Sequence, residues 1–144
     1  PLLRAYNSSN FQELLVSGDA WLVQGWNGQI VNAARENPNI GYLLPKQGTT
    51  IFIDSFCIPA GAAHKALAHQ FINYMLQPET AAAVVNHTGY TVANRAARPY
   101  INKALLNHPA LFPDSTLLEK CEMLEDLGDT ALMVDRLWTE VRSK

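Results

Sequence analysis

The chain has few charged residues and little imbalance between them. Charged side chains make up 17% of the 144 residues, and 11 basic against 13 acidic residues leave a formal net charge of −2. Nucleic-acid-binding domains carry a clustered excess of Lys and Arg, so nucleic acid is not an expected partner. Hydrophobic residues reach 48%, a share that disordered chains lack. The composition is therefore that of a folded globular chain.

Long apolar runs, cysteine clusters and common catalytic motifs are lacking as well. No run approaches the roughly 20 apolar residues of a membrane-spanning helix. Cys57 and Cys121 form no CxxC pair, which argues against a zinc or redox site and leaves either plain buried thiols or one disulfide. The chain has no GxSxG, no HExxH and no phosphate-binding glycine-rich loop. We therefore expect no metal, no cofactor and no catalytic residue.

The beginning of the chain lacks the features of a protein start. Pro1 is not an initiator methionine, and neither a signal peptide nor a transit segment follows it. The opening PLLRAYNSSN is typical of the middle of a protein. We expect the 144 residues to be a piece of a longer polypeptide.

Segments that favour strands alternate with segments that favour helices. Apolar runs predict buried strands at 20–26, 40–45 and 50–59. Amphipathic spacing, caps and proline positions predict helices at 11–18, 29–37, 65–76, 78–87, 115–126 and 129–144. This alternation indicates an α/β fold with a largely parallel sheet.

Two of the predicted helices carry apolar stripes with the spacing of core-facing helices. The stripe on 65–76 comprises Leu67, Ala68, Phe71, Ile72 and Met75. The stripe on 129–144 comprises Ala131, Val134, Leu137, Trp138 and Val141. We therefore expect both helices to bury these residues.

Three residues suggest a binding site. Trp26 ends an apolar run before the Asn27-Gly28 turn, and ligands gather at the carboxyl ends of strands in open α/β sheets. Asp54 interrupts an apolar run, where a buried carboxylate needs either a structural donor or a cationic ligand as partner. Phe52, two residues away, lies on the same strand face. A ring beside a carboxylate suits an ammonium group, although core packing remains the alternative reading for these residues.

Several blocks together resemble the periplasmic spermidine/putrescine-binding proteins of ABC importers. The blocks are GWNG at 25–28, PKQGTTIFIDSFCIPAGA at 45–62, FINYMLQPE at 71–79 and TGYTVANRAAR at 88–98, with RAYNSSN at 4–10 and the ending LWTEVRSK. The resemblance spans essentially the whole chain, but only about the C-terminal half of a typical family member.

The resemblance implies an α/β, periplasmic binding protein-like (type II) fold, of which this chain is the C-terminal half of a two-lobed receptor. Residues 1–49 would belong to the C-terminal lobe, 50–98 to the N-terminal lobe, and 99–144 would return to the C-terminal lobe. It further implies a periplasmic solute-binding protein, not an enzyme. Its partners would be a polyamine, the permease subunits of the importer and the missing N-terminal half.

The resemblance also assigns residues to the ligand. Trp26 would pack against the methylene chain, Asp54 would bind an amino group, and Tyr90 would hydrogen-bond or stack on the polyamine. Phe52 stands where some members carry Trp, which leaves putrescine and spermidine both open. Near the family's glutamine or acid lie Leu124, Glu125 and Asp126, of which only Asp126, or none, carries over.

The sequence also leaves other functions open. The chain is alternatively part of a receptor of the same fold for another small ligand, such as iron or an amino sugar, or a fragment of an α/β enzyme. The pair of Phe52 and Asp54 favours an organic cation, since an iron site needs clustered Tyr, His or carboxylate ligands.

The predicted lobe crossings have a consequence for the isolated chain. Two incomplete lobes would leave apolar faces and strand edges uncovered, and unpaired edges pair with other chains. We therefore expect either a swapped homo-oligomer or continued association with the N-terminal half, and weak polyamine binding by the chain alone.

Overall fold

The computed structural model describes residue 3 and residues 5–143. Residues 1, 2, 4 and 144, which fall within the first and last predicted segments, lie outside this description. The elements are α1 (Phe11–Ser17), α2 (Asn27–Glu36), β1 (Thr50–Ile51), α3 (Lys65–Met75), α4 (Pro78–Thr88), the 3-10 helix η1 (Arg95–Tyr100), α5 (Lys103–Leu106), α6 (Ser115–Leu118), β2 (Glu122–Met123), the 3-10 helix η2 (Gly128–Thr130) and α7 (Ala131–Arg142).

Five of the predicted helices are confirmed, namely α1, α2, α3, α4 and α7. Their local signals explain why they form. Gly18 and Gly89 end α1 and α4 in the left-handed conformation, with φ of 82° and 75°, which glycine adopts without strain. Pro78 opens α4 in its first turn, where its missing N–H costs no hydrogen bond.

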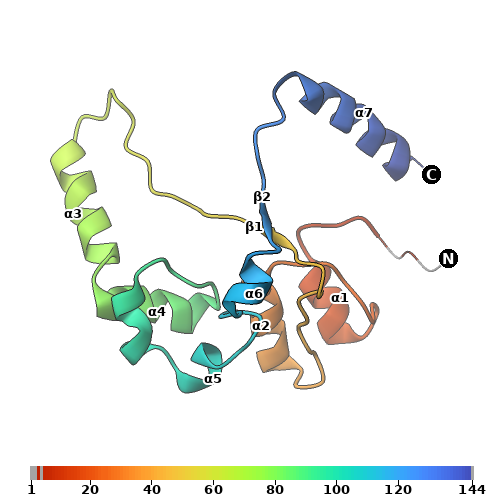
Figure 1. The fold of residues 1–144 in the computed structure, drawn as a ribbon, viewed down its shortest axis with the longest axis horizontal. Helices are drawn as coiled ribbons and strands as arrows, with labels where there is room; N and C mark the ends of the chain where they lie inside the picture. Colours follow the sequence, from red (N-terminus) through yellow and green to blue (C-terminus); the bar gives the residue numbers. More distant parts are fainter. Residues whose placement is uncertain (1–2, 4, 144) are drawn as a thin grey trace.

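The helices surround one hydrophobic core that joins α2, α4, η1 and α5. In Figure 1 these elements form the lower body, from which α3 and α7 extend on opposite sides. The predicted division at 50 and 98 stays a prediction, but the described core draws on all three predicted segments. Its buried residues are Val31, Ala81, Ala82, Val85, Ala97, Ile101, Leu105 and Leu111.

Polar side chains of α2 hold it against the end of α4. The Asn32 Nδ2 atom donates to the Thr88 carbonyl at 2.9 Å, and the Arg35 guanidinium donates to the carbonyls of Asn86 at 2.9 Å and His87 at 3.3 Å. The last carbonyls of a helix lack partners within it and form its negative end. An amide and a guanidinium therefore satisfy them, and the relative position of the two helices is defined.

The sheet is much smaller than the sequence predicted. Within the described residues, β1 and β2 form one parallel pair, with Thr50 opposite Glu122 and Ile51 opposite Met123. The strands predicted at 20–26 and 40–45 are wrong, because neither segment forms a strand, and the one at 50–59 shrinks to two residues. The helix predicted at 115–126 is likewise wrong beyond Leu118.

The reason is that a strand requires a hydrogen-bonded neighbour, which the spacing of its side chains does not supply. Apolar residues of the segment 20–26 face solvent, with Trp21 96% and Leu22 92% exposed. No other described segment pairs with it. The apolar pattern is present, but its partner is not among the described residues.

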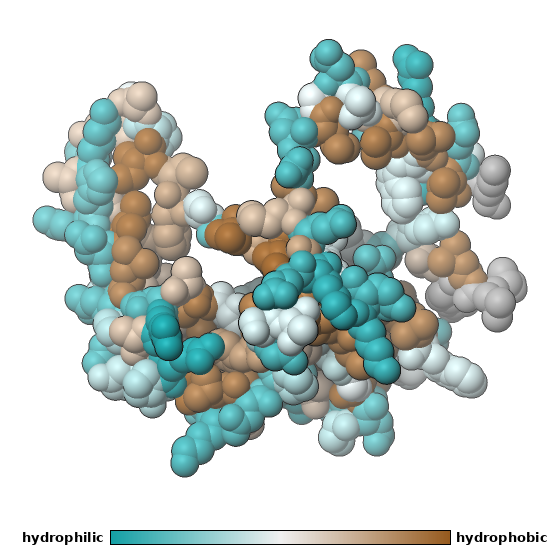
Figure 2. Space-filling model, viewed as in Figure 1, coloured by the Kyte–Doolittle hydropathy of each residue, from teal (hydrophilic) through white to brown (hydrophobic). Residues whose placement is uncertain are grey.

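The apolar stripe of α7 is exposed and that of α3 is exposed or half-buried, so the predicted burial of both stripes is wrong for the described chain. Leu67 on α3 is 64% exposed and Trp138 on α7 is 46% exposed, although Tyr6 packs edge-on against Trp138. Figure 2 shows apolar side chains gathered along one side of α7. Neither helix, nor any other in the described part, has the length and hydropathy needed to cross a membrane.

A close backbone contact precedes the two strands. Gly48 has φ of 103°, and its amide donates to the Pro45 carbonyl at 3.1 Å. A Cβ at this position would lie 2.0 Å from the Lys120 carbonyl oxygen. The Lys120 Nζ atom in turn donates to the Lys46 carbonyl at 3.3 Å. Glycine is thus needed both for the turn and for the approach of the segments that enter β1 and β2.

We predict that Gly48→Ala destabilises the protein by about 2 kcal/mol or more, because it adds left-handed strain and a collision with the backbone. Urea unfolding of the complete protein measures the change. Gly18→Ala has the strain without the collision and should cost about 1 kcal/mol, whereas Gly41→Ala, with open space around it, should change little. Equal losses in all three variants would contradict the role of this contact.

Candidate functional site

Three rings from distant parts of the chain meet in an aromatic cluster, formed by Trp26, Phe52 and Tyr90. The Trp26 and Phe52 centroids lie 4.8 Å apart and the Phe52 and Tyr90 centroids 6.3 Å apart, with interplanar angles of 72° and 77°. Such edge-to-face contacts are the favoured arrangement of aromatic pairs. The structure therefore brings together three of the five residues predicted for the site.

Small residues make the cluster possible. Trp26 is the extended residue that caps α2, and Tyr90 follows Gly89 at the end of α4. A Cβ on Gly28 would lie 2.5 Å from the Tyr90 ring, and one on Gly89 would lie 3.0 Å from the Gly28 carbonyl oxygen. The absence of these side chains lets the first turn of α2 pack directly on Tyr90.

Asp54 lies beside this cluster but is not buried, which corrects the expectation from its apolar neighbours. It follows β1 by three residues, its side chain is exposed, and its charge acts on the Tyr90 hydroxyl. An exposed carboxylate needs no structural partner. Trp26 and Phe52 are also partly open, at 42% and 37% exposure. A carboxylate and two ring surfaces are thus accessible together.

Tyr90 of the cluster and Tyr42, which is electrostatically coupled to it, both have raised pKa values. Burial raises the pKa of Tyr90, a hydrogen bond with the backbone of Gln29 lowers it, and the negative charge of Asp54 raises it. Burial raises the pKa of Tyr42, and Tyr90 adds to the effect. The raised pKa values move both phenols further from ionisation, and a neutral phenol can donate a hydrogen bond.

Sequence reasoning missed Tyr42 and Gln29. Tyr42 lies within the segment 40–45 that the sequence predicts as a strand, and its coupling to Tyr90 depends on the tertiary fold. Gln29 lies in the first turn of α2, and its side-chain Oε1 atom is buried without a hydrogen-bond partner. Its position three residues after Trp26 was visible in the sequence, but an unpaired atom is visible only in the structure.

Asp126 is not brought into the aromatic cluster. It follows β2 by three residues, on the segment that leads to α7 (Figure 1), and its carboxylate accepts a hydrogen bond from the Gly128 amide at 2.9 Å. Because β1 and β2 are parallel and in register, Asp126 occupies the place beyond β2 that Asp54 occupies beyond β1. Asp54 and Asp126 thus occupy matching positions beyond the two strands, but they lie on segments that diverge from each other.

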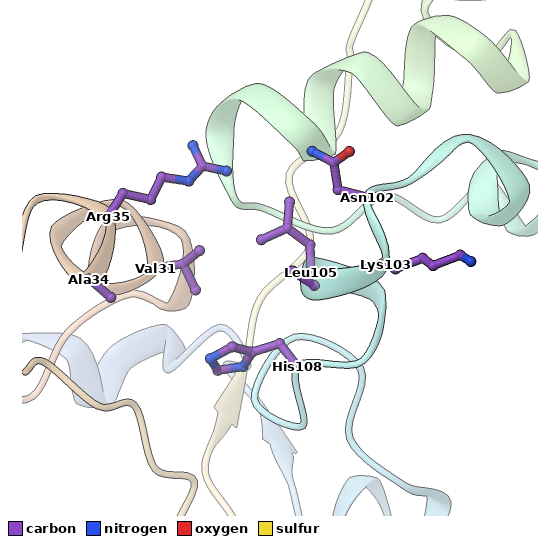
Figure 3. Close-up of a pocket in the computed structure, with 8 residues that line it drawn as sticks. Val31, Ala34, Arg35, Asn102, Lys103, Leu105 and His108 are labelled. Carbon is purple, nitrogen blue, oxygen red and sulfur yellow. The ribbon is translucent and has the colours of Figure 1, made fainter. Parts of the chain in front are cut away.

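A cavity of about 500 Å³ lies elsewhere, between α2 and α5. Figure 3 shows His108 pointing into this space and Lys103 pointing away from it. No residue of the aromatic cluster lines the cavity, whose walls are Val31, Ala34, Arg35, Asn102, Lys103, Ala104, Leu105 and His108. Val31 and Leu105 belong to the core, so the cavity is an opening beside the core rather than part of the aromatic site.

The arrangement favours binding of an organic cation. Aromatic faces attract ammonium groups and pack against methylene groups, and a carboxylate adds a charge-assisted hydrogen bond. Across the described residues, no three His, Cys, Asp or Glu side chains gather into a group that could hold a metal ion. Cys57 and Cys121 are free thiols, and Cys57 is exposed rather than buried.

Comparison with known proteins places these features in a family context. Residues 4–113 match the family described as bacterial extracellular solute-binding protein. The putrescine-binding periplasmic protein PotF of Escherichia coli is 32% identical over 150 residues, covering 99% of this chain and 40% of that protein. The putrescine/cadaverine-binding protein of Pseudomonas aeruginosa is 32% identical over 149 residues, covering 99% and 42%.

A third relative extends the pattern. The spermidine/putrescine-binding periplasmic protein 1 of Haemophilus influenzae is 29% identical over 143 residues, covering 99% of this chain and 40% of that protein. The chain thus spans about two fifths of the length of the curated relatives it matches. These matches confirm the resemblance that the sequence motifs indicated.

The environment of Tyr90 gives a prediction about its ionisation. The pKa of Tyr90 is raised above the usual value of a tyrosine, and Asp54→Asn should lower it, because a neighbouring negative charge disfavours the phenolate. Burial persists in the variant, so the pKa should fall only part of the way. Ultraviolet absorbance of tyrosinate, with Tyr90→Phe subtracted, measures the change. Asp135→Asn on α7 is the control and should leave the pKa unchanged; an unchanged value in Asp54→Asn would contradict the contact.

Proposed function

Since this chain belongs to the bacterial extracellular solute-binding proteins, with their type II periplasmic binding fold, we propose that its protein is the substrate-binding component of an ABC importer. The proposed ligand is a polyamine, putrescine or spermidine. The proposed location is the periplasm, and the proposed partners are the permease subunits. Binding makes and breaks no bond, so the protein would act as a receptor and not as an enzyme.

The aromatic cluster beside Asp54 carries this proposal. A polyamine alternates ammonium groups with methylene chains. The aromatic rings suit the methylene chains, and the carboxylate suits the ammonium groups. The rings of Trp26 and Phe52 offer partly exposed surfaces 4.8 Å apart. Asp54 offers an unshielded carboxylate beyond β1. Names of the matched relatives point to the same ligand class.

Each residue of the proposed site has a distinct role. Trp26 packs against the methylene chain of the ligand. Phe52 contacts the Trp26 ring edge-on and offers its own ring surface to the ligand. Asp54 pairs with an ammonium group. The neutral Tyr90 hydroxyl hydrogen-bonds the ligand or its ring stacks on it.

The remainder of the polypeptide would complete the site. We propose that the chain crosses between the two lobes near residue 50, where β1 begins, and near residue 98, so that 1–49 and 99–144 lie in one lobe and 50–98 in the other. Asp126, at the matching place beyond β2, would then approach the ligand from the other wall. Contact with the rest of the polypeptide, or with a swapped second copy, would cover the apolar stripes of α3 and α7.

A receptor of the same family for another small solute is the alternative. Thermal melting of the complete protein with putrescine, spermidine, an amino sugar and Fe³⁺ separates the possibilities, because a ligand of the native state raises the melting temperature by mass action. A shift with a polyamine alone supports the proposal. A shift with the amino sugar or the iron alone would replace it.

We predict that Asp54→Asn weakens polyamine binding by roughly 10- to 100-fold, since a hydrogen bond to a charged group contributes about 1.5–3 kcal/mol. Isothermal titration calorimetry on the complete protein measures the affinity. The matched control is Asp135→Asn, an exposed acid on α7, which should bind as the wild type does. Wild-type affinity in Asp54→Asn would remove Asp54 from the site.

We predict that Trp26→Ala weakens binding more than Trp26→Phe does, because a phenyl ring still offers a surface to ammonium and methylene groups. Cation–π attraction contributes about 0.5–2 kcal/mol, with Trp the strongest ring. Trp21→Ala, which removes an indole that is 96% exposed and outside the cluster, serves as the control. Equal losses for the two Trp26 variants would indicate that the residue only packs.

A further inference from the structure

The cavity between α2 and α5 has no part in the proposed polyamine site. Its volume of about 500 Å³ lies within the range of roughly 300–1,000 Å³ that small-molecule sites occupy. Val31 and Leu105 form part of its wall, and Figure 3 shows their side chains between those of Arg35 and His108. Small-molecule sites commonly combine such an apolar surface with a few directed polar groups. The polar groups of the wall therefore indicate which ligand would fit.

The charged groups that line the cavity are both cationic. They are Arg35 and Lys103, and none of the lining residues is acidic. The sequence extends this asymmetry, because 80–113, which includes most of α4 and all of η1 and α5, contains Arg95, Arg98 and Lys103 but no Asp or Glu. A surface with charges of one sign attracts ions of the opposite sign. The cavity thus favours an anion and disfavours a polyamine.

Arg35 is held at the edge of the cavity by the contact between α2 and α4. Its guanidinium donates to the Asn32 side-chain oxygen at 2.9 Å and to the carbonyls of Asn86 at 2.9 Å and His87 at 3.3 Å. These three acceptors are neutral oxygens, so they fix the position of the guanidinium without cancelling its charge. A fixed positive charge therefore stands beside the apolar wall.

His108 supplies a hydrogen-bond donor inside the cavity. The Ala110 amide donates to its Nδ1 atom at 3.2 Å, so Nδ1 is an acceptor and the proton of the neutral ring lies on Nε2. The ring is half-buried and points into the cavity (Figure 3). The turn at Ala110 thus fixes both the tautomer and the place of this residue.

We propose that the cavity is a second binding site, which takes a small organic carboxylate, an acid with a short hydrocarbon chain. The hydrocarbon chain lies against Val31 and Leu105, the carboxylate accepts the Nε2–H of His108, and Arg35 adds electrostatic attraction. The apolar wall favours this ligand over an inorganic anion, which has no hydrocarbon surface to remove from water. The site goes beyond the proposed polyamine receptor and does not depend on it.

Thermal melting of the complete protein with butyrate tests the ligand class. Butyramide is the neutral probe of the same shape, butylammonium is the cationic probe, and sodium chloride at the same ionic strength is the reference. Butyrate should raise the melting temperature by mass action, and the other three should raise it less. No rise with butyrate, or an equal rise with butyramide, butylammonium or sodium chloride, would overturn the proposal.

Two substitutions of His108 separate the roles of its ring nitrogens. His108→Asn keeps an acceptor near the place of Nδ1 and removes the Nε2 donor. Its melting temperature without ligand should equal that of the wild type, while its butyrate affinity by calorimetry falls roughly tenfold or more. His108→Gln places an amide donor near the position of Nε2 and should lose less affinity than His108→Asn.

Lys103→Met is the matched control, because it removes a lining charge whose side chain points away from the cavity (Figure 3). It should bind butyrate as the wild type does. An equal loss in Lys103→Met and His108→Asn would indicate general attraction between charges and would overturn the site. Wild-type affinity in His108→Asn would overturn it as well.

Discussion

The site depends on the contact between the first turn of α2 and the end of α4. Because Gly28 and Gly89 have no side chains, the backbones of α2 and α4 lie in direct contact at this point. Asn32 and Arg35 of α2 then donate to the last carbonyls of α4. Because Trp26 and Tyr90 adjoin these two helix ends, the contact that satisfies the backbone of α4 also sets the distance between their rings. The contact that packs α2 on α4 thus also positions the rings of the candidate site.

The parallel pair of β1 and β2 gives a second constraint, this one on the acids. Each strand has only two residues, so the pair contributes little stability by itself. Its effect is geometric, because it sends two segments outward from one point, each with an aspartate three residues beyond its strand. One of these segments also carries Phe52 into the aromatic cluster. The short strand pair therefore relates Asp126 to Phe52 and Asp54, which lie far from it in the sequence.

The sequence predicted the helices better than the strands, for a physical reason. A helix satisfies its own backbone, so Gly18, Pro78 and Gly89 were enough to place the ends of α1 and α4. A strand satisfies its backbone through a neighbour, and the residues around Trp21 have none within the described chain. For the site, residue types and family motifs indicated Trp26, Phe52, Asp54 and Tyr90. The exposure of Asp54, the coupling of Tyr42 and the unpaired oxygen of Gln29 depend on tertiary packing, which local patterns do not contain.

The exposure of Asp54 and the cluster bears on where the binding energy would come from. Two unit charges a few ångströms apart attract weakly in water, by about 1 kcal/mol, and several times more strongly when water is excluded. The described chain leaves Asp54 and parts of Trp26 and Phe52 open to solvent. It also spans only two fifths of the length of its relatives. The groups proposed to contact the ligand are thus open to solvent here, and exclusion of water from them would require a second wall supplied by the rest of the polypeptide. Affinity in such a site follows from closure more than from any one contact.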